Sequence, residues 1–317
     1  VMEAIENIGS ETGWHPKLCF CSMIFFGKEL ASTDLEPIID HLIRLDKVEN
    51  SAIVAMSETK ASDLLFAKTP LDSISSFALQ KIVLKNEWMV STVGVTNLKQ
   101  FAEMNYSKSK SAYMPVISIV HDKTKGKDQQ SATGEGSDGG SGDKSGGAGG
   151  EEVIFDAASI GLFREGRYVG RLSKEETSCY YLFRGPVYDS FITVDVDGEP
   201  QLINVEDNAY SVTVNAKDKT IVLKLSLSVG QEDAKTGADL TKLNRQSVVG
   251  ERVLRDIEDR ITEVSRGFTQ KLALSGADIF MTKDWLYKYK NSDYERVKDL
   301  PLSEFEVIVD VTVRSVD

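Results

Sequence analysis

The sequence contains few residues of the kinds that build disulfide frameworks and metal sites. Only three cysteines occur among 317 residues, too few for a disulfide framework. Cys19 and Cys21 stand two apart, which in a strand places both on one face, where neighbours do not meet the geometry of a bridge. We interpret them as small buried hydrophobic residues. A zinc site would need two more ligands at matching spacing, which Cys179 alone does not supply.

Histidine is equally scarce. His15, His41 and His121 lie far apart, and none stands in an H-x-x-x-H or H-E-x-x-H pattern. The sequence also has no G-x-S-x-G elbow and no Gly-Lys-Ser/Thr phosphate loop after a strand. We therefore predict a protein that is not an enzyme, with no catalytic, cofactor-binding or metal-binding residue and no cofactor.

Two groups of acidic residues suggest chemistry that we do not favour. Asp195 to Glu199 resembles the start of a calcium loop, but its glycine is fourth rather than sixth, and the flanking alternation favours a hairpin turn. The pairs Glu151-Glu152 and Glu175-Glu176 could form an acid/base pair. In a chain with 49 acidic residues, solvated surface is the better interpretation.

No run of about 20 apolar residues is present, so no bilayer-spanning helix is predicted. No charged start followed by an apolar region indicates a signal peptide. The sequence opens at Val1 as if inside a helix, which we interpret as a truncated or processed start.

The chain lacks a basic surface for nucleic acid. Its net charge is −12, and the densest lysine run, 123–127, is flanked by Asp122 and Asp128. An acidic surface repels a polyanion unless a local basic patch intervenes. We therefore predict that nucleic acid is not a partner.

Residues 1–120 are predicted to form an N-terminal α/β domain, because apolar strand-like runs alternate with amphipathic helical patterns. Strands are expected at 18–26, 51–56 and 114–120, and helices at 35–45, 61–66, 73–84 and 96–104. Residues 121–152 are predicted to be a linker or long loop. Between Gly134 and Gly150 nearly every residue is Gly, Ser, Asp, Lys or Ala, which cannot offset the entropy of ordering.

Residues 153–189 are predicted to form a small middle β region. The runs 154–163 and 168–172 flank the turn 164–167 and indicate a hairpin. An isolated hairpin is marginal in water. We therefore expect this region to be incomplete without upstream residues. It would then show an exposed strand edge, lean on a neighbouring domain or pair with another copy of the chain. A short helix, or a turn leading into a strand, is expected at 175–183.

Residues 190–317 are predicted to form a C-terminal α+β domain. A strand meander is expected at 190–196, 210–215 and 220–229. The longest helix is expected at 251–275, where apolar residues recur every three or four positions up to Gly276. The alternating residues 304–314 indicate a closing strand. The fold class is thus α+β and multi-domain, and this C-terminal sheet is mostly antiparallel with helices packed on one face.

The order of motifs along the chain resembles the Ger(x)C family, the lipoprotein C subunit of spore germinant receptors. The first half carries the resemblance in 2–5, 17–31, 35–45, 60–65 and 69–71; the second half carries it in 158–163, 168–172, 175–177, 275–280 and 285–290. Two departures stand out. Met281 occupies a position where the family has glycine, and the signal peptide and lipid-attachment cysteine of the family are absent.

The resemblance implies a non-enzymatic protein required for nutrient-triggered germination. It implies membrane-embedded A and B subunits as partners. It also implies a place on the outer face of the spore inner membrane, reached through a lipid anchor that this soluble chain lacks. The family supplies no agreed ligand-contacting residues. The alternative hypothesis is a soluble extracytoplasmic small-molecule binding module or an unrecognised hydrolase, for which a large apolar pocket would be the sign.

Overall fold

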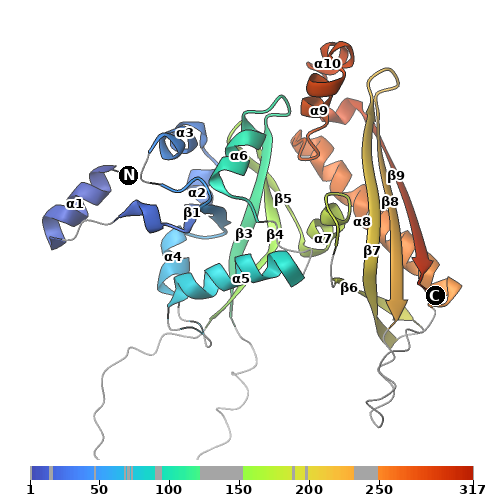
Figure 1. The fold of residues 1–317 in the computed structure, drawn as a ribbon, viewed down its shortest axis with the longest axis horizontal. Coiled ribbons are helices and arrows are strands. Elements are labelled where there is room, and N and C mark those ends of the chain that lie inside the picture. The colour runs from blue at the N-terminus through green and yellow to red at the C-terminus, as the bar shows by residue number, and fades with distance from the viewer. Residues whose placement is uncertain are drawn as a thin grey trace, which may run out of the picture.

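Two β-sheets lie side by side in the computed structural model, with helices between them (Figure 1). The structure describes residues 2–13, 17–45, 48–67, 69, 72, 74–89, 95–121, 153–187, 190–196, 199–231 and 249–316. The predicted linker lies outside the described residues except for His121. Within the described part of the chain, no helix is both long and apolar enough to cross a membrane.

The first sheet has five strands in the order β1-β2-β3-β4-β5. Their bounds are β1 Met23–Gly27, β2 Ile53–Ser57, β3 Ser111–His121, β4 Val153–Arg164 and β5 Arg167–Leu172. β1, β2 and β3 are parallel, whereas β4 and β5 add to the β3 side in antiparallel fashion. The second sheet has the order β6-β7-β8-β9, with β6 Ser190–Val196, β7 Glu199–Asn215, β8 Thr220–Gln231 and β9 Glu306–Ser315.

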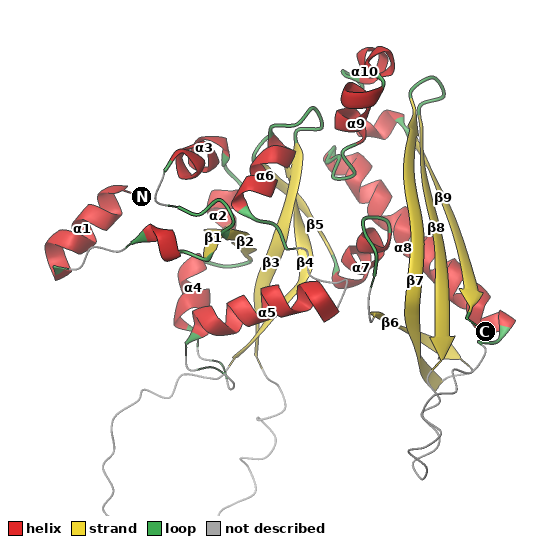
Figure 2. Cartoon of the chain, viewed as in Figure 1, coloured by secondary structure: helices red, strands yellow, loops and turns green. Residues whose placement is uncertain are grey.

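Helices cover both faces of the first sheet and one face of the second (Figure 2). Those before β4 are α1 Met2–Thr12, α2 Lys28–Ala31, α3 Glu36–Arg44, α4 Ala61–Phe66, α5 Ser75–Met89 and α6 Leu98–Asn105. Those after β5 are α7 Lys174–Leu182, α8 Glu251–Ser275, α9 Thr282–Tyr289 and α10 Asn291–Val297. Short 3-10 turns occur at Leu18–Phe20 and Leu302–Glu304.

Strand β2 shows why the first sheet needs helices on both faces. All five of its residues are buried. Val54 and Met56 enter the larger core with residues of α3 and α6, whereas Ile53 and Ala55 enter a second core with residues of α4 and α5. A parallel strand buried on both faces is expected to be continuously apolar, as this run is.

The predicted hairpin is present, but its pairing differs from the expectation of a separate, incomplete sheet. β4 pairs with β3 along its length, from His121↔Val153 to Ser111↔Arg164. Ile160 and Leu162 are therefore fully buried in the first sheet's core. The hairpin's partner was missed because local alternation reveals a strand but not the distant strand that it pairs with.

The predicted strand over 18–26 begins later than expected. Pairing with β2 starts at Met23↔Ile53, and residues 18–20 form a 3-10 turn. Cys19 is exposed and Cys21 is half-buried, so the prediction that both are buried is wrong. The physical reason is that residues before Met23 have no partner strand and do not enter the sheet.

The second sheet confirms a mostly antiparallel arrangement with helices on one face. β6, β7 and β8 form an antiparallel meander, and β9 lies parallel to β8. Helix α8 ends at Gly276 in the left-handed conformation, as predicted. Its residues Ile257, Ile261 and Phe268 are buried in the larger core together with Leu223 and Leu225 of β8. The α+β class predicted from the sequence is therefore confirmed.

Strand β7 is much longer than the strand predicted at 210–215. It contains a bulge between Val205 and Asp207, and the neighbouring Asn208 is buried. The Asn208 side chain accepts a hydrogen bond from Val187 N at 2.8 Å and donates to Leu182 O and Gly185 O. This polar residue therefore ties the end of α7 to the second sheet, which its sequence context did not reveal.

Candidate functional site

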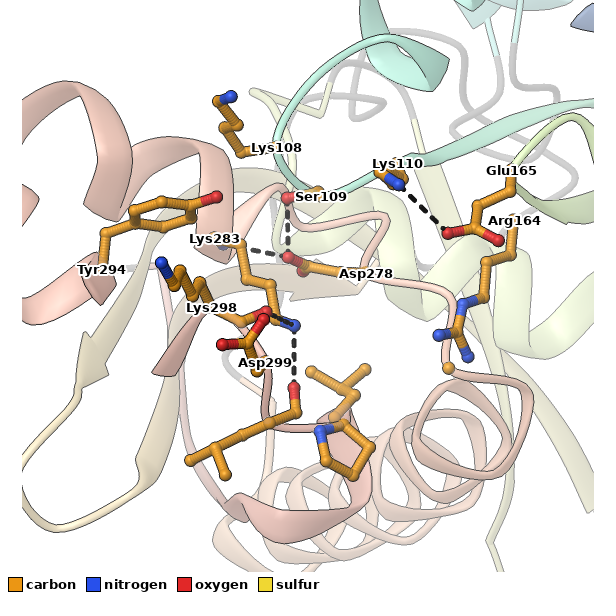
Figure 3. A pocket seen from close by; sticks show the side chains of 14 residues that line it. Lys108, Ser109, Lys110, Arg164, Glu165, Asp278, Lys283, Tyr294, Lys298 and Asp299 are labelled. Carbon is orange, nitrogen blue, oxygen red and sulfur yellow. Dashed lines mark hydrogen bonds and ion pairs between the residues drawn. The ribbon is translucent and has the colours of Figure 1, made fainter. Parts of the chain in front are cut away.

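A polar pocket of about 350 Å³ lies where the end of the first sheet meets the helices of the second (Figure 3). One wall comes from the loop before β3 and the end of β4, and the other comes from α9, α10 and the segment that follows α10. Residues of five separate segments meet here: Lys108, Ser109, Lys110, Arg164, Glu165, Gly276, Asp278, Lys283, Tyr294, Lys298, Asp299, Leu300, Pro301 and Leu302.

Asp278 holds the floor of this pocket together. Its carboxylate is only 4% exposed. It accepts hydrogen bonds from Ser109 Oγ at 2.7 Å, from Thr282 N at 3.1 Å and Oγ1 at 2.9 Å, and from Lys283 N at 3.0 Å. Because the carboxylate is fully engaged, Asp278 positions the α9 start against the first sheet and is not a free acid.

Ser109 and Ser111 complete this junction. Ser109 Oγ also accepts a hydrogen bond from Asp284 N at 3.1 Å, while Ser111 Oγ accepts one from Asp278 N at 2.9 Å. Both serines are buried. The wall contributed by the first sheet is therefore joined to α9 by a continuous hydrogen-bond network.

Lys283 reaches into the pocket from α9. Its Nζ donates to Lys298 O at 2.9 Å and to Leu300 O at 2.7 Å, which holds the half-buried ammonium in place. Burial lowers the pKa of Lys283; the charge of Asp278 opposes this shift, and the charge of Arg164 adds to it. Both cations line the same pocket.

Arg164 lies on the opposite wall, against Gly276. A Cβ at Gly276 would meet the Arg164 guanidinium in its present position, so this exposed side chain would have to move aside. Among the described residues, the Arg164 side chain forms no ion pair or hydrogen bond. Its neighbours are paired: Lys110 contacts Glu165 at 3.3 Å, and Lys298 contacts Glu295 at 2.8 Å.

The acidic and histidine residues considered in the sequence do not gather in this pocket. Glu175 forms an ion pair with Arg260 of α8 at 2.7 Å, and Glu176 forms one with Lys271 at 2.7 Å. His41 lies alone on the exposed side of α3, and His121 ends β3. His15, Glu151 and Glu152 lie outside the described residues.

Two further sequence interpretations can be compared with the structure. Asp195 and Glu199 flank a hairpin with the pairing Val196↔Glu199, as the alternation indicated, and residues 197 and 198 between them are not described.

Burial raises the pKa of the Cys179 thiol to about 12, so this cysteine is protonated and unreactive. In the described part of the chain, no three His, Cys, Asp or Glu side chains are placed to hold a metal ion.

The sequence matches two family descriptions in succession. Residues 1–119 match the "Spore germination protein N-terminal domain", and residues 158–317 match "Spore germination B3/GerAC like, C-terminal". The chain belongs to the GerAC-like family of spore germination proteins. This GerAC-like membership confirms the resemblance drawn from the motifs and supports a role as a germinant receptor component.

A solved structure shares the fold of this GerAC-like chain. The crystal structure of the GerBC protein aligns with a TM-score of 0.58 over 93% of this chain and 79% of that one, at 12% sequence identity. No curated protein sequence gives a significant match. At this identity the likeness shows the fold alone, so the residues of the pocket in the GerAC-like chain are argued from its own structure.

Sequence reasoning did not find this pocket. Lys108, Arg164, Asp278 and Lys283 come from distant segments and share no motif. The one local signal was Gly276, which was assigned only to the end of the long helix and which also lies against Arg164.

Proposed function

We propose that the protein is the non-enzymatic C subunit of a spore germinant receptor complex, which triggers germination in response to nutrients. The observation that carries this proposal is the presence of both GerAC-like family matches, in order, over most of the chain. In the full-length protein a lipid anchor would hold it at the outer face of the spore inner membrane. Its partners there would be the membrane-embedded A and B subunits.

The chemistry of the pocket supports a role in binding rather than catalysis. General acid–base catalysis needs a titratable group that is free to exchange a proton with the substrate. The Asp278 carboxylate is occupied by four hydrogen bonds, and Glu165 is occupied by Lys110. Among the described residues, Asp299 is the one acidic side chain of the pocket without such a contact, and it has no second free acid beside it. The Lys283 ammonium is held by two backbone carbonyl groups. These groups can position a ligand or a neighbouring domain.

The test is co-purification from membranes. The full-length protein, carrying an affinity tag, is co-expressed with A and B subunits of a germinant receptor from the same genome, and the membrane fraction is purified through the tag. We expect both subunits to be recovered in fixed proportion. In spores, deletion of the gene should abolish the response to the nutrients of that receptor, and reintroduction of the gene should restore it. Recovery of neither subunit, together with normal germination of the deletion strain, would refute the proposal.

The second candidate, a small-molecule binding module of the extracytoplasmic space, is favoured by the volume of the pocket, whereas its polar lining differs from the apolar lining expected for such a module. A volume of about 350 Å³ lies at the lower end of the range of small-molecule sites. Such a module would bind its ligand without membrane partners. Loss of germination in the deletion strain would argue against a function restricted to this role.

A further inference from the structure

Two cations face each other across the pocket without a carboxylate joining them. Arg164 comes from the end of β4 in the first sheet. Lys283 comes from α9, which contacts β7 of the second sheet, so the two residues belong to different sheets and their packed helices, here called sheet assemblies (Figure 3). Two positive charges that are brought together destabilise the folded chain unless a negatively charged group lies between them. This arrangement is typical of sites that hold an oxyanion.

Arg164 is the stronger of the two determinants. A guanidinium presents its N–H donors in a planar fork that matches a carboxylate or a phosphate. In the described chain these donors have no acceptor, and the guanidinium lies against Gly276 at the pocket. The exposed guanidinium therefore lines the pocket with its hydrogen-bonding capacity unused.

Lys283 supplies a fixed second cation. Its ammonium has three donors, and two of them are taken by the carbonyl groups of Lys298 and Leu300. One donor is left for a ligand. Since both carbonyl groups belong to the segment that lines the pocket, the position of the ammonium is set before any ligand arrives, which lowers the entropic cost of binding.

The other charged groups limit what can bind. Lys110 is neutralised by Glu165, Lys298 by Glu295, and Lys108 lies over the ring of Tyr287 at 4.7 Å from its centroid. Asp299 also lines the pocket, and its negative charge acts on Lys283. A ligand with many phosphates would be repelled by Asp299, whereas one oxyanion group placed at Arg164 would be accommodated.

We propose that this pocket binds a small molecule through a single oxyanion group, a carboxylate or a phosphate, held between Arg164 and Lys283. The ligand would contact both sheet assemblies and would therefore stabilise their junction. The site belongs to this chain alone, so the proposal stands whether or not the chain assembles with receptor subunits.

The experiment uses the purified 317-residue chain and two simple probes, acetate and inorganic phosphate, titrated against chloride at constant ionic strength. Binding is followed by isothermal calorimetry and by the thermal unfolding midpoint, because a ligand of the folded state raises that midpoint with saturation. We expect saturable binding of at least one probe. Arg164→Gln should weaken it at least about tenfold, since a charge-assisted hydrogen bond is lost.

Matched variants keep the test specific. Asp299→Asn removes the opposing charge and should tighten binding of the same probe, whereas Lys224→Gln, on the far side of the second sheet, should leave it unchanged. Arg164 is exposed and unbonded, so its variant should fold even if Lys283→Gln does not. The relative affinities of acetate and phosphate identify the preferred oxyanion. Two results would overturn the proposal: no saturable binding of either probe, or binding by Arg164→Gln as tight as that of the parent chain.

Vesicles of phosphatidylglycerol provide a separate arm for a phosphate carried by a lipid. If Arg164-dependent sedimentation with these vesicles occurs while neither soluble probe binds, the oxyanion belongs to a membrane surface and the small-molecule proposal is wrong. Absence of sedimentation, together with saturable probe binding, supports it.

Discussion

Ser109 donates a hydrogen bond to Asp278 across 2.7 Å, and both side chains are buried. Ser109 precedes β3 in the first sheet, whereas Asp278 follows α8, which packs on the second sheet. This contact joins residues that are far apart in the sequence. It lies at the centre of the network that holds the two sheet assemblies together.

Asp278→Ala is expected to lower the free energy of unfolding by about 3 kcal/mol, because several buried donors lose their acceptor at once. Ser109→Ala removes one partner only and should cost about 1 kcal/mol. Urea unfolding of both variants measures the difference. If Asp278→Ala changes the free energy of unfolding by less than about 0.5 kcal/mol, the range of ordinary surface substitutions, the network does not stabilise the junction.

The buried face of α8 gives a second prediction. Ile261 is 3% exposed in the larger core, so Ile261→Asp would place an unpaired carboxylate there and should cost several kcal/mol. We expect loss of the folded baseline in circular dichroism at ambient temperature. Gln270→Asp, on the exposed side of the same helix, is the control. Parent-like melting of Ile261→Asp would mean that this face instead serves as a partner-binding surface.

Elements with a clear local sequence pattern were predicted well, whereas the pairing of strands that lie far apart in the sequence was not. Helix α8 was placed at the observed residues because six apolar positions recur along it and Gly276 ends it. The β4–β5 turn was also recognised locally, because residues 164–167 separate two strand-like runs. In the structure Glu165 and Gly166 have positive φ angles, as a tight turn requires. The partner of β4 is β3, which is separated from it by the long segment 122–152. No local sequence pattern indicates which distant strand a given strand pairs with.

The candidate pocket could not be predicted for the same reason. Arg164 and Lys283 each read as ordinary surface charges in their own segments, and only the packing of α9 against the end of the first sheet brings them together. Strand β7 illustrates a related limit. Pro200 and the polar residues Asn204 and 206–208 weaken its strand pattern, yet pairing with β6 and β8 on its two sides keeps it extended.

Met281 has a positive φ angle of 60° just before α9, at the position where the family pattern has glycine. This left-handed conformation costs a residue with a Cβ roughly 1–2 kcal/mol, whereas glycine adopts it freely. We therefore expect Met281→Gly to be more stable than Met281→Ala by about 1 kcal/mol, although both lose the packing of the methionine side chain. The thermal unfolding midpoints of the two variants measure this difference in stability. An alanine variant as stable as the glycine variant would show that the backbone relaxes out of this conformation.

Glu58 predicts a dependence of stability on pH. It accepts a hydrogen bond from Ser118 at 2.6 Å and forms an ion pair with Arg171 at 2.8 Å, so three segments of the first sheet meet at its carboxylate. The Ser118 hydrogen bond, opposed by burial and assisted by the charge of Arg171, lowers the pKa of Glu58 from 4.5. A lowered folded-state pKa contributes stability above pH 4.5 that is lost as the pH falls through the folded-state value.

Glu58→Gln should therefore be less stable than the parent chain at about pH 7, by a small amount because the pair is partly exposed, and the gap should close at about pH 3. Urea midpoints of both proteins at the two pH values give the double difference, and Glu49→Gln, at an exposed position, corrects for general charge effects. A gap that stays constant on acidification would mean that the Glu58 carboxylate does not stabilise the fold.

The linker predicted at 121–152 leads to one more expectation. His121 and Val153 are cross-strand partners, so the ends of the segment between them are already fixed by the sheet. Shortening residues 122–152 by half should change the free energy of unfolding by only about 0.6 kcal/mol, because the closure entropy varies slowly with length. A loss of several kcal/mol in denaturant melts would show that the segment has a structural role.

The pairing of β4 with β3 also bears on how such proteins can be recombined. The two family matches end and begin at residues 119 and 158, yet residues 158–164 of β4 belong by sequence to the second match and by hydrogen bonding to the first sheet. An exchange of C-terminal parts between relatives would therefore also replace Ile160 and Leu162, which fill the core of the retained N-terminal part. Chimeras joined between β3 and β4 inherit a mismatched sheet, whereas a junction placed after Leu172 keeps its five strands from one parent.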